Sequence, residues 1–290
     1  MDQVRQPAWR HPGFLLLYAI GATVLAIIVS AGLSHMAPPH RAGWWAVAFA
    51  SIVAAIFVAV YVAFCRLIEG RPARELALAP AAIELSAGIV IGLVLFSLVV
   101  GLIAAFGGYR VIGHRDAGVL VPALAVAIVS GVSEEIFFRG FFFRLTEKWL
   151  GTWAALALSA GLFGALHLGN PNASVLAAVA IMLEAGIMLA AIYMITRRLW
   201  AAIGLHAAWN FAQGGIYGIP VSGGAMDGVL RPDIRGSDLL TGGAFGAEAS
   251  LPAIVVATTF GLVMLYVAWR RGQFTAPIWV RRRQGAVEQA

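Results

Sequence analysis

Charged residues are scarce in this sequence. Asp, Glu, Lys and Arg make up 12% of its 290 residues, and 61% of the residues are hydrophobic. A soluble domain averages about 25% charged residues, so this composition excludes an ordinary soluble domain. The mean hydropathy is +0.86. Long apolar runs without strand-like alternation favour membrane-spanning helices over a barrel.

Cysteine is also nearly absent. Cys65 is the single cysteine of the chain, which excludes an internal disulfide and a cysteine-based metal cluster. We interpret it as a small apolar residue within a helix. The net charge of +6 is compatible with nucleic-acid binding, but in a membrane protein it is better explained by arginines in cytoplasmic loops. No nucleic-acid partner is therefore expected.

Eight apolar segments approach the roughly 20 residues that a helix needs to cross a bilayer. They lie at about 14–33, 44–64, 86–106, 119–143, 152–168, 173–195, 199–217 and 251–270. The first follows Arg5 and Arg10 and so resembles a signal peptide, but its long core without a cleavage site favours a retained helix. Tandem repeats and a separate soluble domain are lacking. We expect an all-α polytopic bundle of about eight transmembrane helices, forming one integral membrane domain over 1–290.

The distribution of basic residues predicts the orientation. With the N-terminus inside, the cytoplasmic segments hold 15 of the 20 Lys and Arg residues. The outside loops hold the other five, which are Arg41, Arg110, Arg115, Arg231 and Arg235. This bias places both termini in the cytoplasm.

Two connections stand out by their composition. The loop 66–84 mixes both signs of charge, and we expect a solvated, partly helical connection. The longest loop, 218–250, is rich in Gly, Asp and Ser. A loop of that length is either functional or disordered, and the sequence leaves this choice open.

Strongly polar groups within the spans are few, and all lie in the fourth to seventh segments. They are Glu134, Glu135, Arg139, His167, Glu184, His206 and Asn210. An ionisable residue at membrane depth costs at least a few kcal/mol and is a functional hypothesis by default. The chemistry is therefore expected in the middle of the chain.

Spacing indicates which of these groups meet. Glu134 lies 17 residues before a turn at Gly151, and His167 lies 16 residues after it, so the two are roughly level on antiparallel helices. His206 and Asn210 share one helix face because they are four residues apart. If the hairpin projects into the cytoplasm by about two turns, all four are level. The site would then receive water from the cytoplasmic side.

The adjacent glutamates are expected to differ in role. Glu134 and Glu135 point about 100° apart on a helix, so both cannot face one group. Glu135 and Arg139 have the i, i+4 spacing of an ion pair, which leaves Glu134 to face the site. Glu184, in the neighbouring sixth segment, is assigned a supporting role.

This set of residues suits hydrolysis by activated water. Glu134 in an apolar pocket can act as a general base on water, and His167 can share that water or bind a metal. His206 and Asn210 can donate hydrogen bonds to an oxyanion. Glu134, His167 and His206 are also a possible zinc set, although the common His-Glu-x-x-His helix is absent. The sequence leaves zinc and a metal-free site both open, and it contains no convincing serine elbow.

Three motifs on successive apolar segments together resemble the CPBP family, which includes CAAX prenyl endopeptidases of the Rce1 type and bacteriocin-processing or immunity (Abi) proteins. The motifs are Glu134-Glu135-x-x-x-Arg139, Phe163-x-x-x-His167 and His206-x-x-x-Asn210. The motif-bearing core covers about 119–217. The resemblance implies an intramembrane endopeptidase, metallo- or glutamate-dependent, with a cytoplasm-facing cavity.

Carried over by motif, the resemblance implies that Glu134 activates water with His167 while His206 and Asn210 stabilise the oxyanion. The expected partners are a peptide or membrane-protein substrate and the lipid bilayer, and the expected location is a bacterial inner (plasma) membrane. One alternative is a non-catalytic membrane scaffold or bacteriocin-immunity protein that retains the fold. Another is a proton-coupled transporter using Glu134 and Glu184, which the lack of a repeat disfavours.

Overall fold

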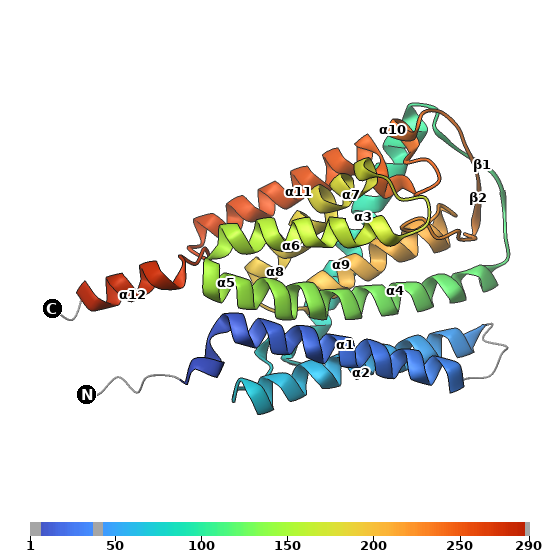
Figure 1. Ribbon diagram of the computed structural model, residues 1–290. Coiled ribbons are helices and arrows are strands. Elements are labelled where there is room, and N and C mark those ends of the chain that lie inside the picture. Colours follow the sequence, from blue (N-terminus) through green and yellow to red (C-terminus); the bar gives the residue numbers. More distant parts are fainter. Residues whose placement is uncertain (1–6, 37–42, 288–290) are drawn as a thin grey trace.

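The computed structural model describes residues 7–36 and 43–287. Arg5 and Arg41, which entered the prediction of orientation, lie outside the described residues. The chain folds as a bundle of long helices (Figure 1), which confirms the predicted all-α class. The four uninterrupted long helices are α1 (Pro12–Met36), α2 (Trp44–Ala63), α3 (Ala81–Ala105) and α11 (Leu251–Arg270).

The middle of the chain consists of helices joined end to end through π or 3-10 turns. They are α4 (Leu120–Glu135) with η5 (Ile136–Phe143) and α5 (Arg144–Leu150); α6 (Thr152–Leu166) with η6 (His167–Gly169); α7 (Val175–Ile181) with η7 (Met182–Gly186) and α8 (Ile187–Thr196); and α9 (Trp200–Phe211) with η8 (Ala212–Ile216). The π turns η5 and η7 carry Arg139 and Glu184. Such turns interrupt the regular bonding of a helix and are frequent at functional sites.

Shorter elements complete the described chain. They are η1 (Ala8–Arg10), η2 (Phe64–Ile68), η3 (Arg74–Leu76), β1 (Tyr109–His114), η4 (Ala117–Val119), β2 (Leu230–Ile234), α10 (Asp238–Thr241), η9 (Ala247–Ala249) and α12 (Ile278–Val287).

Among the described residues, seven helical stretches are long and apolar enough to cross a membrane. They correspond to the first six predicted segments and the eighth. The remaining predicted segment, 199–217, forms α9 of 12 residues, which continues into η8 of 5 residues. Most of α9 is buried by its neighbours, so this helix is enclosed by protein and does not need the full length of a lipid-facing span.

Glycines allow α9 to lie directly against its neighbours. A Cβ atom added at Gly88 of α3 would lie 2.2 Å from the backbone oxygen of Ala201, and one at Gly204 of α9 would lie 2.4 Å from that of Leu85. A Cβ at Gly131 of α4 would lie 2.8 Å from Ala207. Small residues at such contacts let helix backbones approach closely. The result is that the polar face of α9 is held against α4.

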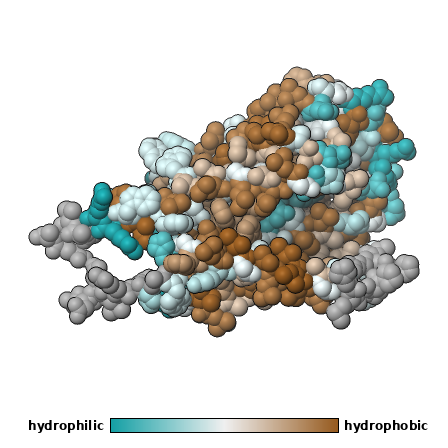
Figure 2. Space-filling model, viewed as in Figure 1, coloured by the Kyte–Doolittle hydropathy of each residue, from teal (hydrophilic) through white to brown (hydrophobic). Residues whose placement is uncertain are grey.

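The two ends of the bundle differ. The start of α1, together with α5 and α12, lies at one end, and the ribbon of β1 and β2 lies at the other (Figure 1). These strands are antiparallel, and Tyr109 is opposite Ile234. Figure 2 shows hydrophobic residues across the middle of the visible face and hydrophilic residues toward both ends. This distribution is the one that a membrane-embedded bundle requires.

The segment 218–250, whose nature the sequence left open, has a defined fold. It contains β2, α10 and η9 and contributes buried residues such as Phe245 and Glu248. The purely helical prediction missed the ribbon because β1 and β2 are short strands that lie far apart in the sequence. Their pairing is a tertiary contact that no local pattern reveals.

The prediction of a solvated, partly helical connection at 66–84 is confirmed for its helical turns and its many exposed residues, but it is wrong for the charges of Glu69 and Glu75. The two guanidinium Nη atoms of Arg144 lie 2.9 and 2.8 Å from the carboxylate oxygens of Glu69, whose side chain is 3% exposed. Arg71 pairs with both Glu69 and Glu75. Burial opposes ionisation of Glu69, but bonds from Arg144 and Arg71 prevail and lower its pKa. Part of the mixed charge of this loop therefore forms internal ion pairs, and those with Arg144 join the loop to α5.

Candidate active site

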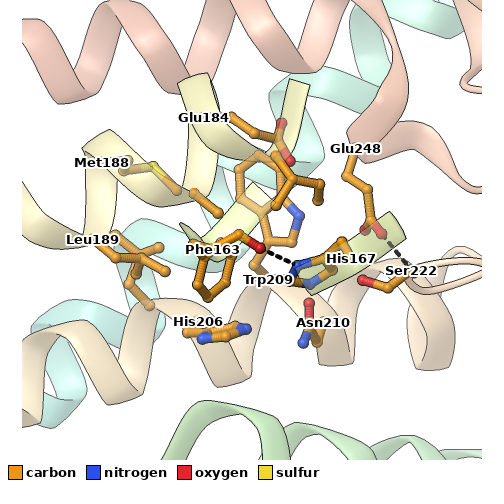
Figure 3. A pocket seen from close by; sticks show the side chains of 13 residues that line it. Phe163, His167, Glu184, Met188, Leu189, His206, Trp209, Asn210, Ser222 and Glu248 are labelled. Carbon is orange, nitrogen blue, oxygen red and sulfur yellow. Dashed lines mark hydrogen bonds between the residues drawn. The ribbon is translucent and has the colours of Figure 1, made fainter. Parts of the chain in front are cut away.

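A cavity of about 30 Å³ brings together four of the polar residues that the sequence singled out. They are His167, Glu184, His206 and Asn210, and Ser222 and Glu248 from the segment 218–250 join them (Figure 3). The remaining lining is apolar and consists of Phe163, Ile181, Ala185, Met188, Leu189, Leu205 and Trp209. A few convergent polar groups in an apolar pocket are the usual form of a small binding site.

His206 is fixed from behind by a buried carboxylate. Its Nδ1 lies 2.9 Å from Oε1 of Glu135, so the ring donates a hydrogen bond to that oxygen. Its Nε2 points the other way and lies 3.9 Å from Oε2 of Glu134. A carboxylate placed behind a histidine orients the ring and fixes its tautomer. The two glutamates of the motif therefore contact opposite nitrogens of one imidazole.

The predicted pair of Glu135 and Arg139 is confirmed. Nη1 of Arg139 lies 2.8 Å from Oε1 of Glu135, and both side chains are fully buried. Nη2 of Arg139 also donates to the carbonyl of Ala185 at 2.8 Å, within the π turn η7, and its guanidinium lies 4.9 Å from the ring centre of Phe163. Arg139 thus ties α4 to η7, and Glu135 serves both this link and His206. The sequence predicted only the first of these contacts.

Glu134 lies beside the cavity and not within its lining. Its side chain is 34% exposed, whereas that of Glu135 is fully buried, as expected for neighbours that point about 100° apart. Oε2 of Glu134 is itself buried and has no hydrogen-bond partner among the described residues. The free oxygen faces His206 across a gap too long for a direct hydrogen bond.

His167 ends α6 with one nitrogen engaged. Its Nδ1 lies 2.7 Å from the carbonyl oxygen of Phe163, which can only accept, so Nδ1 carries the proton. In the neutral ring Nε2 is therefore an unprotonated acceptor. The ring of Phe163 packs 4.8 Å from that of His167 and 6.2 Å from that of His206. Phe163 therefore packs against both rings.

Asn210 connects α9 to α4. Its Nδ2 donates to Oγ of Ser130 at 2.8 Å, and that hydroxyl donates to the carbonyl of Val126. One amide hydrogen of Asn210 is therefore used to join the helices. The second amide hydrogen remains available as a donor.

The set Glu134, His167 and His206 does not fit a zinc site in this arrangement. No three His, Cys, Asp or Glu side chains within 7–36 and 43–287 are grouped so that they could hold a metal ion. His206 directs one nitrogen to Glu135 and only the other toward Glu134. The donors are therefore not gathered around a common point.

Glu184 and Glu248 extend from the side of the cavity opposite His206 and Asn210 (Figure 3). Each is 2% exposed. Burial raises the pKa of Glu248 to about 7, against the opposing effect of its hydrogen bonds to Ser222. Sequence reasoning found Glu184 but missed Glu248. The available signal was one carboxylate among small residues directly before the last span, in Gly246-Ala-Glu248-Ala-Ser250.

One border of the cavity is formed by a segment at the end of the bundle opposite α5 and α12. Ser222 and Glu248 belong to the segment that joins α9 to α11 at the end carrying the β1–β2 ribbon. The end that carries α5 and α12 is the opposite one. Counting residues from Gly151 placed Glu134 and His167 level with each other, but it could not show which end of the bundle lies closer to the cavity. A segment distant in sequence decides this.

Comparison with known proteins concerns this same region. Residues 116–212 match the family described as Rce1-like, type II CAAX prenyl endopeptidase. This central segment is Rce1-like. It contains all seven polar residues that the sequence singled out, whereas Ser222 and Glu248 lie beyond it. No curated protein and no solved structure matches the chain. The match covers about a third of the chain, and the seven apolar helices support an integral membrane protein.

Proposed function

We propose that this protein is an intramembrane endopeptidase that hydrolyses peptide bonds of a membrane-associated substrate with water activated by Glu134. The observation that supports this most is the gap between Oε2 of Glu134 and Nε2 of His206. The two atoms are 3.9 Å apart, and Oε2 has no hydrogen-bond partner among the described residues. One water molecule can bond to both, since polar atoms farther apart than 3.5 Å are commonly bridged in this way.

In the proposed reaction, Glu134 takes a proton from this water as the hydroxide attacks the peptide carbonyl carbon. The carbonyl oxygen becomes an oxyanion, which accepts hydrogen bonds from the Nε2–H of His206, whose ring is doubly protonated with Glu135 behind it, and from the free amide hydrogen of Asn210. The C–N bond then breaks, and the amine leaves with the proton that Glu134 received. General-base catalysis of this kind contributes about 10²- to 10⁴-fold, and preorganised donors to an oxyanion contribute a comparable factor.

The other motif residues prepare these groups. Glu135 orients His206 and stabilises positive charge on its ring, in the way that the buried carboxylate of a catalytic triad does. Arg139 holds Glu135 in place through a fully buried ion pair. His167, whose Nε2 is a free acceptor, is the second group that can receive a proton at the site. This assignment keeps Glu134, His167, His206 and Asn210 as the reacting set.

We further propose that both termini are cytoplasmic. The end that carries α5 and α12 also carries most of the arginines, among them Arg144, Arg197 and Arg281. Basic residues are enriched in cytoplasmic segments of membrane proteins. In this orientation the segment 218–250 covers the site from the opposite side of the membrane.

The test uses the purified full-length chain in lipid nanodiscs and a peptide library read by mass spectrometry. Wild type is expected to cleave, and Glu134→Gln and His167→Gln are each expected to lose activity by about 100-fold or more with an unchanged melting temperature. Asp227→Asn is the matched control, because that carboxylate is 68% exposed and lies outside the cavity. Full activity in both site variants would overturn the assignment.

A wild-type chain that cleaves nothing would instead favour the non-catalytic scaffold. A second measurement separates these outcomes in cells. The membrane proteome of a strain expressing Glu134→Gln should accumulate uncleaved substrate relative to wild type. An identical proteome in both strains would contradict the proposed hydrolysis.

A further inference from the structure

Glu184 and Glu248 differ from every other described glutamate in forming no ion pair, and the ring of His206 acts on Glu248 only from across the cavity. Six of the eight glutamates within 7–36 and 43–287 lie beside a basic side chain. The six pairs are Glu69 with Arg144, Glu75 with Arg71, Glu84 with Arg198, Glu134 with His206, Glu135 with Arg139 and Glu147 with Arg197. The protein thus supplies a cation to its buried carboxylates with the exception of the two that line the cavity.

The carboxylate of Glu184 is open toward the cavity. Glu184 is only 2% exposed, and its Oε2 has no hydrogen-bond partner among the described residues. It extends into the cavity from η7, on the same side as Glu248 (Figure 3). A buried carboxylate oxygen without a partner costs free energy that a ligand can recover by supplying a hydrogen bond.

A cation is the ligand that suits two carboxyl groups, and the walls and size of the cavity indicate which kind of cation it can hold. No lysine or arginine lines it, and Met188, Leu189 and Trp209 supply apolar and aromatic contacts suited to a hydrocarbon stem. The cavity measures about 30 Å³, and a site for one water needs about 10–15 Å³. We expect this space to favour a compact ammonium group over the wider planar guanidinium of arginine. Trp209 also offers an aromatic face, to which a cation is attracted.

We propose that the carboxyl groups of Glu184 and Glu248 form a subsite that binds a primary ammonium group of the substrate next to the scissile bond. This inference rests on the proposed function, because only a peptidase has a peptide substrate to place here. Binding of an ammonium group at the two carboxyl groups can be measured without catalysis. The ammonium comes either from a lysine side chain or from a free N-terminus. No lysine or arginine lines the subsite to pair with a C-terminal carboxylate, so a substrate that presents a free C-terminus at this position is disfavoured.

The first arm of the test measures binding without catalysis. The probe is n-butylammonium, which reproduces the lysine side chain, and the readout is the melting temperature of the full-length chain at millimolar probe. The probe should raise the melting temperature of wild type and of Glu134→Gln, whereas n-butanol and n-butylguanidinium should not. Glu184→Gln and Glu248→Gln should each abolish the shift. An equal shift in both variants, or no shift in wild type, would overturn the subsite.

The second arm measures cleavage preference. Peptides acetylated and amidated at their ends carry lysine, norleucine or arginine at each position in turn, and a parallel set has free N-termini. Wild type should favour lysine over norleucine by about tenfold or more in kcat/KM, as expected for a hydrogen-bonded charge, or should favour the free N-terminus if that is the source. In Glu184→Gln and Glu248→Gln this ratio should fall toward one.

The two arms distinguish the failure of each proposal. Binding of n-butylammonium without cleavage of any peptide would refute the peptidase and keep the subsite. Cleavage with equal kcat/KM for lysine, norleucine and free N-termini would keep the peptidase and refute the subsite. Should Glu184→Gln fail to fold, Glu248→Gln provides the same comparison from an element outside the membrane spans.

Discussion

Replacing Glu135 by Gln removes one charge of a fully buried pair and leaves the other. Nη1 of Arg139 lies 2.8 Å from Oε1 of Glu135, and neither side chain is exposed. Breaking a buried pair by removing one partner costs about 3–5 kcal/mol, because an uncompensated charge remains. His206 also loses the carboxylate that accepts its Nδ1 proton. We therefore expect Glu135→Gln to be among the most destabilising single changes in the site.

The sequence itself provides the assay. Cys65 is the single cysteine and is fully buried, so a thiol-reactive fluorescent dye reports unfolding of the detergent-solubilised chain. Each kcal/mol shifts the melting temperature of a domain of 150–250 residues by about 2–4 °C. The expected fall for Glu135→Gln is therefore about 6–20 °C.

Glu134→Gln is the matched control, since it makes the same substitution at the next residue. Its side chain is 34% exposed and contacts no arginine, so we expect a change of about 0.5 kcal/mol or less, or about 2 °C. The double variant Glu135→Gln with Arg139→Met removes both charges and should melt closer to wild type than Glu135→Gln does. A melting temperature of Glu135→Gln as near to wild type as that of Glu134→Gln would refute the reasoning.

Three further changes test other parts of the structure by the same dye assay. Gly88→Ala should destabilise the protein by about 1–3 kcal/mol, because its Cβ would lie 2.2 Å from a backbone oxygen of α9. The control Gly101→Ala should be neutral or stabilising, because no atom lies within 4 Å of its added Cβ. Equal effects of the two changes would argue against the close contact of α3 and α9. The pKa of Glu248 in the fold, about 7, lies above the value of about 4.3 for an unfolded chain. Its contribution to stability is therefore present in full below about pH 4 and is lost as the pH rises through 7, by about 4 kcal/mol. Glu248→Gln should lack this loss between pH 4.5 and pH 8, and parallel curves would contradict the buried carboxyl. Arg144→Met should destabilise by about 2 kcal/mol, because Glu69 loses two charge-assisted hydrogen bonds and keeps only Arg71 as a partner. Adding Glu69→Gln should restore part of the loss; additive losses would show that the pair does not act as a unit.

Local sequence was sufficient for the helices and for half of the site. Apolar length alone located α11 at 251–270, as the structure has it, because a lipid-facing helix must be apolar over its whole span. The spacing of Glu135 and Arg139 predicted their ion pair, and the four-residue spacing of His206 and Asn210 predicted a shared face. These are properties of one helix, and periodicity determines them.

Contacts between segments far apart in the chain could not be predicted from the sequence. The same reasoning interpreted the charges of 66–84 as solvated, since Glu69 and Arg144 are 75 residues apart and no local pattern links them. The bond from Glu135 to His206 spans 71 residues. It changes the role of Glu135 from a partner of Arg139 alone to the residue that also orients the histidine.

The sequence by itself determined that this protein is a helical membrane bundle with its polar residues concentrated in one central region, because apolar length and charge placement are set by the bilayer. Only the tertiary structure decided that Glu134 lies at the edge of the cavity, that Glu248 enters it from a segment outside the motifs, and that the cavity borders the end opposite α12. Those outcomes depend on how closely helices approach and how a long connection folds back, which are set by packing between residues distant in the chain.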